Sequence, residues 1–230
     1  MRKMIRQLLN KAGYDIIKTN MHDDSKAGIT KKVQVGKFQI AMPGNNPQIS
    51  TYKYRPDAND LLGELSVCVE TKYPNLWVID IGANVGDTIA IIKSAIDIPV
   101  IGIEGDDISY KFLEANTQQF QNVTILKEFL GEKRQTMRVE MEKSGWNTTL
   151  IPTENKGQEL SLKTLDKVLE ENSLADKEIK ILKIDTEGFD TIILRGATET
   201  IQKHSPVIFF EYNKTNMDAI GEDGMSTLFS

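Results

Sequence analysis

The run from Trp77 to Thr88 limits the possible fold more than any other stretch of the sequence. It reads WVIDIGANVGDT, with apolar residues on both sides of Asp80 and a turn that contains Gly82 and Gly86. A short, continuous apolar run is typical of a buried parallel strand. The glycines permit a tight turn, and the free N–H groups of a following helix favour a carboxylate or phosphate. The sequence therefore predicts an α/β fold with a small-molecule site at the carboxyl end of this strand.

A second apolar run, residues 100–103, ends in Glu104, 24 positions after Asp80. A carboxylate at that point can accept hydrogen bonds from both hydroxyls of a ribose. The dinucleotide fingerprint requires a glycine where Asp80 stands, which argues against a dehydrogenase. The alternative is that Asp80 only caps the turn and that Glu104 is a solvated strand end. We favour a nucleoside-containing cofactor, and the predicted cofactor-binding residues of the two loops are Asp80, Gly82, Asn84, Gly86 and Glu104.

The spacing from Asp80 to Gly86 resembles motif I of the class I S-adenosylmethionine-dependent methyltransferases. Several further segments resemble the FkbM family of these enzymes, in the same order along the chain, from about residue 77 to 211. These are the KIDTEGFD run 183–190, LRGA at 194–197, TLD at 164–166 and LEAN at 113–116. One departure is Gly105, where the family usually has proline.

The resemblance implies a Rossmann-like class I methyltransferase fold, a mainly parallel sheet with helices on both faces. The apolar runs 123–126, 179–184 and 207–210 supply the remaining predicted strands. A helix is expected over 109–119, with Ser109 as its N-cap, another over 164–171, and further helical turns after Phe189. Nineteen residues follow Glu211 (230 − 211), too few for the family's last helix and terminal hairpin, so we expect a C-terminal truncation.

The resemblance also places site residues beyond the first two strands. The loop after the third strand is expected near the adenine ring of S-adenosyl-L-methionine, so that Glu128 or Phe129 contacts it, simple loop packing being the alternative. Asp185 is the first choice for a general base or for orienting the acceptor, and Glu187 and Glu211 are expected beside it. These three carboxylates could instead hold a divalent cation, and no metal is assigned.

The first 72 residues predict an extension packed on a core domain of residues 73–230. A basic amphipathic helix is expected over 1–13, a hairpin around residues 33–42 and a helix over 57–72. The polar stretch with His22 is expected to be a solvated loop rather than a metal site. A second polar stretch, 144–157, is expected to be a substrate-facing loop.

Composition narrows the class of protein further. A net charge of −5 argues against a broad nucleic-acid surface. The single cysteine, Cys68, excludes an internal disulfide, fits a reducing cytoplasm and is expected to be buried in its apolar run. No run of about 20 apolar residues that could insert stably in a membrane is present. A soluble, cytoplasmic protein is expected.

The expected activity is S-adenosyl-L-methionine-dependent O-methylation of a hydroxyl on a small molecule, that is a sugar, glycan or secondary metabolite. Two alternatives remain open. One is a methyltransferase acting on protein or RNA, and the other is a non-catalytic module that binds the cofactor or takes part in assembly.

Overall fold

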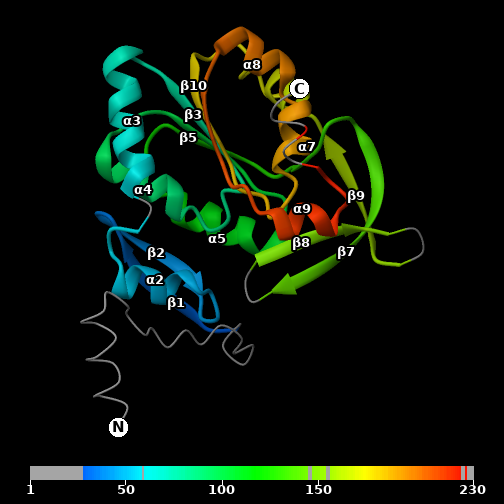
Figure 1. Cartoon of the computed structure of the whole chain (residues 1–230). Helices are drawn as coiled ribbons and strands as arrows, with labels where there is room; N and C mark the ends of the chain where they lie inside the picture. Colours follow the sequence, from blue (N-terminus) through cyan, green and yellow to red (C-terminus); the bar gives the residue numbers. More distant parts are fainter. Residues whose placement is uncertain (1–27, 59, 145–146, 154–155, 224–225, 227–230) are drawn as a thin grey trace, which may run out of the picture.

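A central sheet of five parallel strands forms the middle of the molecule (Figure 1). The computed structural model describes residues 28–226 apart from 59, 145–146, 154–155 and 224–225. The strand order is β11-β10-β3-β4-β5. The five strands coincide with the five apolar runs of the sequence: β3 (Trp77–Ile81), β4 (Val100–Ile103), β5 (Val123–Leu126), β10 (Ile179–Ile184) and β11 (Val207–Phe210). The predicted α/β class is confirmed.

Alternate residues of β3, β4, β5 and β10 supply the cores on the two faces of this sheet, whereas Val207 and Phe209 of the edge strand β11 are exposed. Ile79 packs in one apolar cluster with side chains of α6 (Leu165–Glu171), α7 (Asp190–Arg195) and the start of α8 (Thr198–His204). Val78 packs in the other with side chains of α3 (Asp60–Lys72), α4 (Asp87–Ala95) and α5 (Asp107–Thr117). Helices therefore cover both faces, as the alternation of strands and helices predicts.

A second, smaller sheet extends from the carboxyl side of the central one. Its order is β6-β9-β7-β8, formed by β6 (Phe129–Leu130), β9 (Gln158–Lys163), β7 (Gln135–Ser144) and β8 (Asn147–Pro152). β7 and β8 pair antiparallel as a hairpin. The segment 144–157, expected to be a loop, is therefore a strand in its middle part, because the Thr- and Ile-containing run 147–152 pairs with β7.

The N-terminal element packs on the helical face that α4 and α5 form. β1 (Thr30–Val35) and β2 (Phe38–Pro43) make the predicted hairpin, and α2 (Gln48–Tyr54), which the sequence did not predict, follows. Figure 1 shows the hairpin and α2 beside α4 and α5. The expected helix over 1–13 and the loop with His22 lie outside the described residues.

The Asn116 side chain of α5 makes hydrogen bonds that hold this element to the core, and Ser94 Oγ accepts another from Lys37 N (2.8 Å). Its amide oxygen accepts a hydrogen bond from Ala41 N (2.8 Å), and its Nδ2 donates to Ala41 O (2.8 Å) and Val85 O (2.8 Å). Apolar contacts between Val35, Ile40 and Met42 of the hairpin and residues around α4 complete the attachment.

Two local expectations are wrong. α5 begins at Asp107, and its N-cap is Asp106, whose carboxylate accepts from the backbone N–H of Ile108 and Ser109. Asp106 is the N-cap, in place of the expected Ser109, because from its position before the first turn its carboxylate reaches two backbone N–H groups that have no partner within the helix. Cys68 is exposed, since α3 turns Leu62, Ser66 and Val69 inward and leaves Cys68 on the opposite face. Among the described helices, none has the length and apolarity to cross a bilayer.

Candidate functional site

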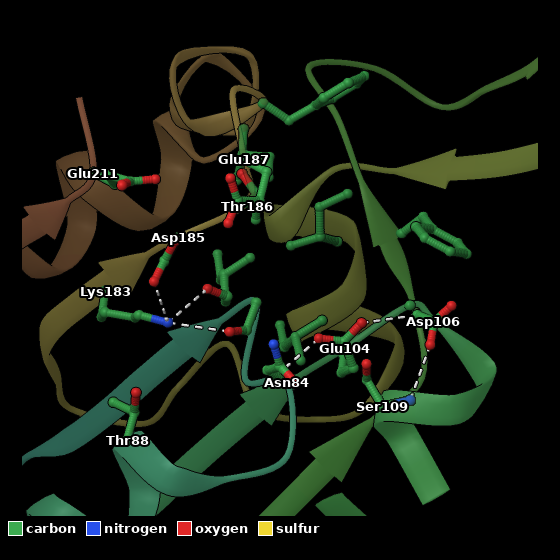
Figure 2. A pocket seen from close by; sticks show the side chains of 18 of the residues that line it. Asn84, Thr88, Glu104, Asp106, Ser109, Lys183, Asp185, Thr186, Glu187 and Glu211 are labelled. Carbon is green, nitrogen blue, oxygen red and sulfur yellow. Dashed lines mark hydrogen bonds and ion pairs between the residues drawn. The ribbon is translucent and has the colours of Figure 1, made fainter. Parts of the chain in front are cut away.

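A cavity of about 290 Å³ lies at the carboxyl ends of the central strands (Figure 2). The loops after β3, β4, β10 and β11 form its floor because parallel strands end at the same edge of a sheet. Other parts of the wall come from β6, from β8, from the start of α4 and from the start of α2. The predicted residues that line it are Gly82, Asn84, Glu104, Glu128, Phe129, Asp185, Glu187 and Glu211.

The loop after β3 crosses the middle of the cavity. Gly82 has a φ of 72°, and a Cβ there would overlap the carbonyl oxygen of Asp185, so no side chain fits. Asn84 follows with its backbone N–H directed at Glu104. Gly86 is the N-cap of α4 and lies outside the cavity lining. This loop therefore lines the cavity mainly with main-chain atoms and with little side-chain volume.

Glu104 is held in one orientation by two backbone N–H groups. Its Oε2 accepts from Asn84 N (2.9 Å) and its Oε1 from Asp106 N (2.8 Å). Burial raises the pKa of the Glu104 carboxyl, and these two hydrogen bonds oppose that rise. Each oxygen keeps a lone pair for a ligand. The side chain can therefore accept two further hydrogen bonds, as from the two hydroxyls of a ribose.

Asp80 lies beneath this loop and not in the cavity wall. Its buried carboxylate pairs with Lys183 Nζ at 2.8 Å, the two residues being neighbours in the β3–β10 register. Lys183 Nζ also donates to Gly82 O (3.1 Å) and lies 3.8 Å from Asp185 Oδ2. Burial alone would lower the pKa of Lys183, but Asp80 and Asp185 outweigh burial and raise it, so Lys183 is a cation. The structure thus gives Asp80 an indirect position, which differs from the cofactor contact expected of it.

Lys183 was not singled out from the sequence, although it lines the cavity. A signal for it exists in the sequence. Two lysines, Lys180 and Lys183, stand in the apolar strand 179–184, and one aspartate stands in the apolar strand 77–81; the strand register pairs Lys183 with Asp80. Because an unpaired charge is costly inside a sheet, two opposite charges in adjacent buried strands predict an ion pair.

Three carboxylates gather at the β10–β11 end of the cavity. Asp185, Glu187 and Glu211 each place an oxygen within 4.8 Å of the others (Figure 2). Burial and the neighbouring Glu211 and Asp185 raise the pKa of Glu187 to about 7, although Asn216 Nδ2 donates to its Oε2 (2.8 Å). Burial, and next Asp185, raise the pKa of Glu211. Such a group can take up a proton near neutrality, and its oxygens are also ligands that a divalent cation accepts.

The loop after β5 brings Glu128 and Phe129 into the wall near Glu104. Glu128 accepts a hydrogen bond from Lys163 Nζ (2.6 Å), so its carboxylate already has a cationic partner. Phe129 lies so close to Gly105 that a Cβ there would overlap its ring. This packing explains why glycine, rather than the family's usual proline, follows Glu104.

Asn46 and Gln48 line the cavity from the start of α2, together with Asp87 and Thr88 of α4. Burial raises the pKa of Asp87, and the hydrogen bond that its Oδ2 accepts from Tyr52 (2.7 Å) opposes that rise. Apart from the expectation of an N-terminal extension, this wall was not predicted, because α2 has no clear pattern in the sequence.

The chain is similar to known methyltransferases. Residues 80–228 match the family model described as the methyltransferase FkbM domain. Among solved structures, the chain is similar to a proposed caffeoyl-CoA O-methyltransferase from Staphylococcus aureus, at 12% identity and a TM-score of 0.45, over 80% of this chain and 83% of that one. It is also similar to a protein-L-isoaspartate O-methyltransferase, at 13% identity and a TM-score of 0.25, over 78% and 72%. A search among curated proteins finds no match.

Proposed function

Since the chain belongs to the FkbM methyltransferase domain family and has the class I methyltransferase fold, we propose that it is an S-adenosyl-L-methionine-dependent O-methyltransferase. We further propose that its acceptor is a hydroxyl group of a sugar, glycan or secondary metabolite. The observation that carries the proposal is one continuous cavity with Glu104 at one end and the Asp185–Glu187–Glu211 cluster at the other.

The cavity residues fit the proposed cofactor. The two carboxylate oxygens of Glu104 are fixed in place and each keeps a lone pair, so they can accept hydrogen bonds from the ribose hydroxyls. The ring of Phe129 offers an apolar surface for adenine, and this favours Phe129 over the ion-paired Glu128 for that contact. When bound, S-adenosyl-L-methionine supplies a methyl group on a positively charged sulfur. We assign Asp80 to holding Lys183, and through it the Gly82 carbonyl, rather than to touching the cofactor.

The carboxylate cluster accounts for the acceptor side. A hydroxyl must lose its proton as it gains the methyl group, and a base works best when its pKa lies near the working pH. Glu187, with a pKa of about 7, suits this role better than Asp185, which lies 3.8 Å from the cation of Lys183 and is about half exposed. Asp185 and Glu211 would then orient the acceptor. Holding both reactants in place contributes about 7–11 kcal/mol to lowering a barrier of this kind.

The first test is calorimetric titration with S-adenosylhomocysteine and, separately, with NAD. Wild-type protein should bind S-adenosylhomocysteine and not NAD. Glu104→Gln should bind it at least tenfold more weakly, because one oxygen that accepts a hydroxyl becomes a donor. Glu159→Gln, an exposed glutamate of the smaller sheet, is the matched control and should bind as the wild type does.

A transfer assay then separates the remaining possibilities. Labelled methyl groups should pass to polyhydroxylated small molecules. Binding without transfer to any acceptor would favour a non-catalytic module, and transfer to protein or RNA would replace the proposed acceptor. NAD binding in place of S-adenosylhomocysteine would refute the proposal as a whole.

A further inference from the structure

The amide oxygen of Gln48 is buried in the cavity wall without a hydrogen-bond partner in the described part of the chain. Leaving such a group unpaired costs about 1–3 kcal/mol, and buried polar groups in native proteins nearly always have a partner. Asn46, beside it in the wall, is 4% exposed. Two amides at a cavity surface, one of them unsatisfied, indicate that a ligand group completes the hydrogen bonding.

The position of Gln48 follows from α2. Gln48 and Tyr52 are four residues apart and therefore lie on the same face of the helix. The Tyr52 hydroxyl donates to Asp87 Oδ2 (2.7 Å), and both groups are buried. This contact fixes that face of α2 against the start of α4, and Gln48, one turn before Tyr52 on that face, lines the same cavity as Asp87 and Thr88.

Hydrogen bonds within the protein hold the cavity wall that contains Asn46 and Gln48 in place without a ligand. The Asn46 side-chain oxygen accepts from Gln48 N (2.8 Å), which fixes the turn into α2. The preceding strand β2 is held by the two hydrogen bonds between Ala41 and Asn116. Because these groups are already ordered, little conformational entropy is lost when a ligand binds to the amides.

The ligand group is identified by where this wall lies. In Figure 2, Thr88 lies on one side of Asn84, and Asp106 and Ser109 lie on the other, next to Glu104. If the ribose of the proposed cofactor lies at Glu104, the end of the molecule away from adenine is directed toward the Thr88 side. That end is an amino acid, with an ammonium and a carboxylate. An amide oxygen accepts from an ammonium, and an amide N–H donates to a carboxylate.

We propose that Gln48, with Asn46 beside it, binds the amino-acid end of the cofactor. The inference rests on the proposed function and extends it, because it makes the N-terminal element a part of the cofactor site. Without α2, the cavity would keep its nucleoside end and lose the groups that recognise the amino acid.

Two ligands that differ only at that end provide the test. S-adenosylhomocysteine carries the amino acid, and 5′-methylthioadenosine shares the adenosine and the sulfur but lacks it. Gln48→Met, which keeps the size of the side chain, should raise the Kd for S-adenosylhomocysteine about tenfold or more, the loss typical of a hydrogen bond to a charged group. Its Kd for 5′-methylthioadenosine should stay within about twofold of wild type. Gln202→Met, at an exposed position on α8, is the control.

The outcomes separate this inference from the proposed function. Equal weakening of both ligands, or no change in either, would overturn the role of Gln48 while the cofactor assignment stands. A wild-type protein that binds neither ligand would refute the proposed function and this inference with it. Gln48→Ala supplies a second variant in case methionine disturbs the fold, since alanine suits a helix.

Discussion

Replacing Lys183 by methionine tests how the buried charges beneath the cavity are held. The Lys183 side chain is 5% exposed and its partner Asp80 is fully buried, with 2.8 Å between Nζ and Oδ1. Removing one member of such a pair costs about 3–5 kcal/mol, because the remaining charge is left uncompensated. For a chain of this size, each kcal/mol lowers the Tm by about 2–4 °C. Lys183→Met should therefore lower the Tm by about 6–20 °C.

Urea unfolding followed by tryptophan fluorescence measures the free energy, and calorimetry measures the Tm. Lys167→Met is the matched control, since Lys167 pairs with Glu170 at the surface and should contribute less than about 1 kcal/mol. The double variant Asp80→Asn/Lys183→Met should be more stable than the sum of the two single losses predicts, because it removes both charges together.

Two results would refute this reasoning. One is a Lys183→Met variant within about 1 kcal/mol of wild type. The other is strict additivity in the double variant, which would mean that Asp80 and Lys183 do not stabilise each other.

Three further outcomes are expected. The rate of methyl transfer should rise with pH through about 7 and level off above it, because Glu187 accepts a proton only when ionised. Glu187→Gln should lower the rate about 10²–10⁴-fold and abolish the inflection near pH 7. A pH profile that is unchanged in this variant would exclude Glu187 as the base. Gly105→Ala should weaken S-adenosylhomocysteine binding in calorimetry, since its Cβ displaces the Phe129 ring, and wild-type affinity would show that the ring is not in contact with the ligand. Cys68 should react fully with a thiol reagent in the native protein, and protection until unfolding would contradict its exposed position on α3.

The central sheet could be predicted from the sequence because its inner strands β10, β3 and β4 are buried on both faces, and the partly buried edge strands β5 and β11 are apolar runs too. Each appears as a short apolar run, and residues such as Val78 and Ile79 are apolar whichever core they enter. The cavity edge followed from the same pattern, since Glu104, Asp185 and Glu211 each come directly after such a run. The family resemblance added the loop with Glu128 and Phe129.

The smaller sheet and α2 could not be predicted in the same way. β8 contains Asn, Thr and Pro, so its composition resembles that of a loop, and it is a strand because β7 pairs with it. α2 has one buried residue, Tyr52, and thus almost no apolar periodicity. Gln48 was missed for that reason. Cys68 was assigned to the interior because its neighbours are apolar, although helical geometry turns it outward.

The three hydrogen bonds of Asn116 have a consequence for the order of folding. They join residues 41, 85 and 116, which are distant in sequence. The β1–β2 hairpin is local and can form early, but it can be locked in place only after β3, α4 and α5 have assembled, because Asn116 belongs to the last of these. The wall that carries Gln48 is therefore expected to be completed late, after the end of the cavity that holds Glu104 exists. Amide hydrogen exchange should accordingly show the hairpin opening at lower free energy than the central strands.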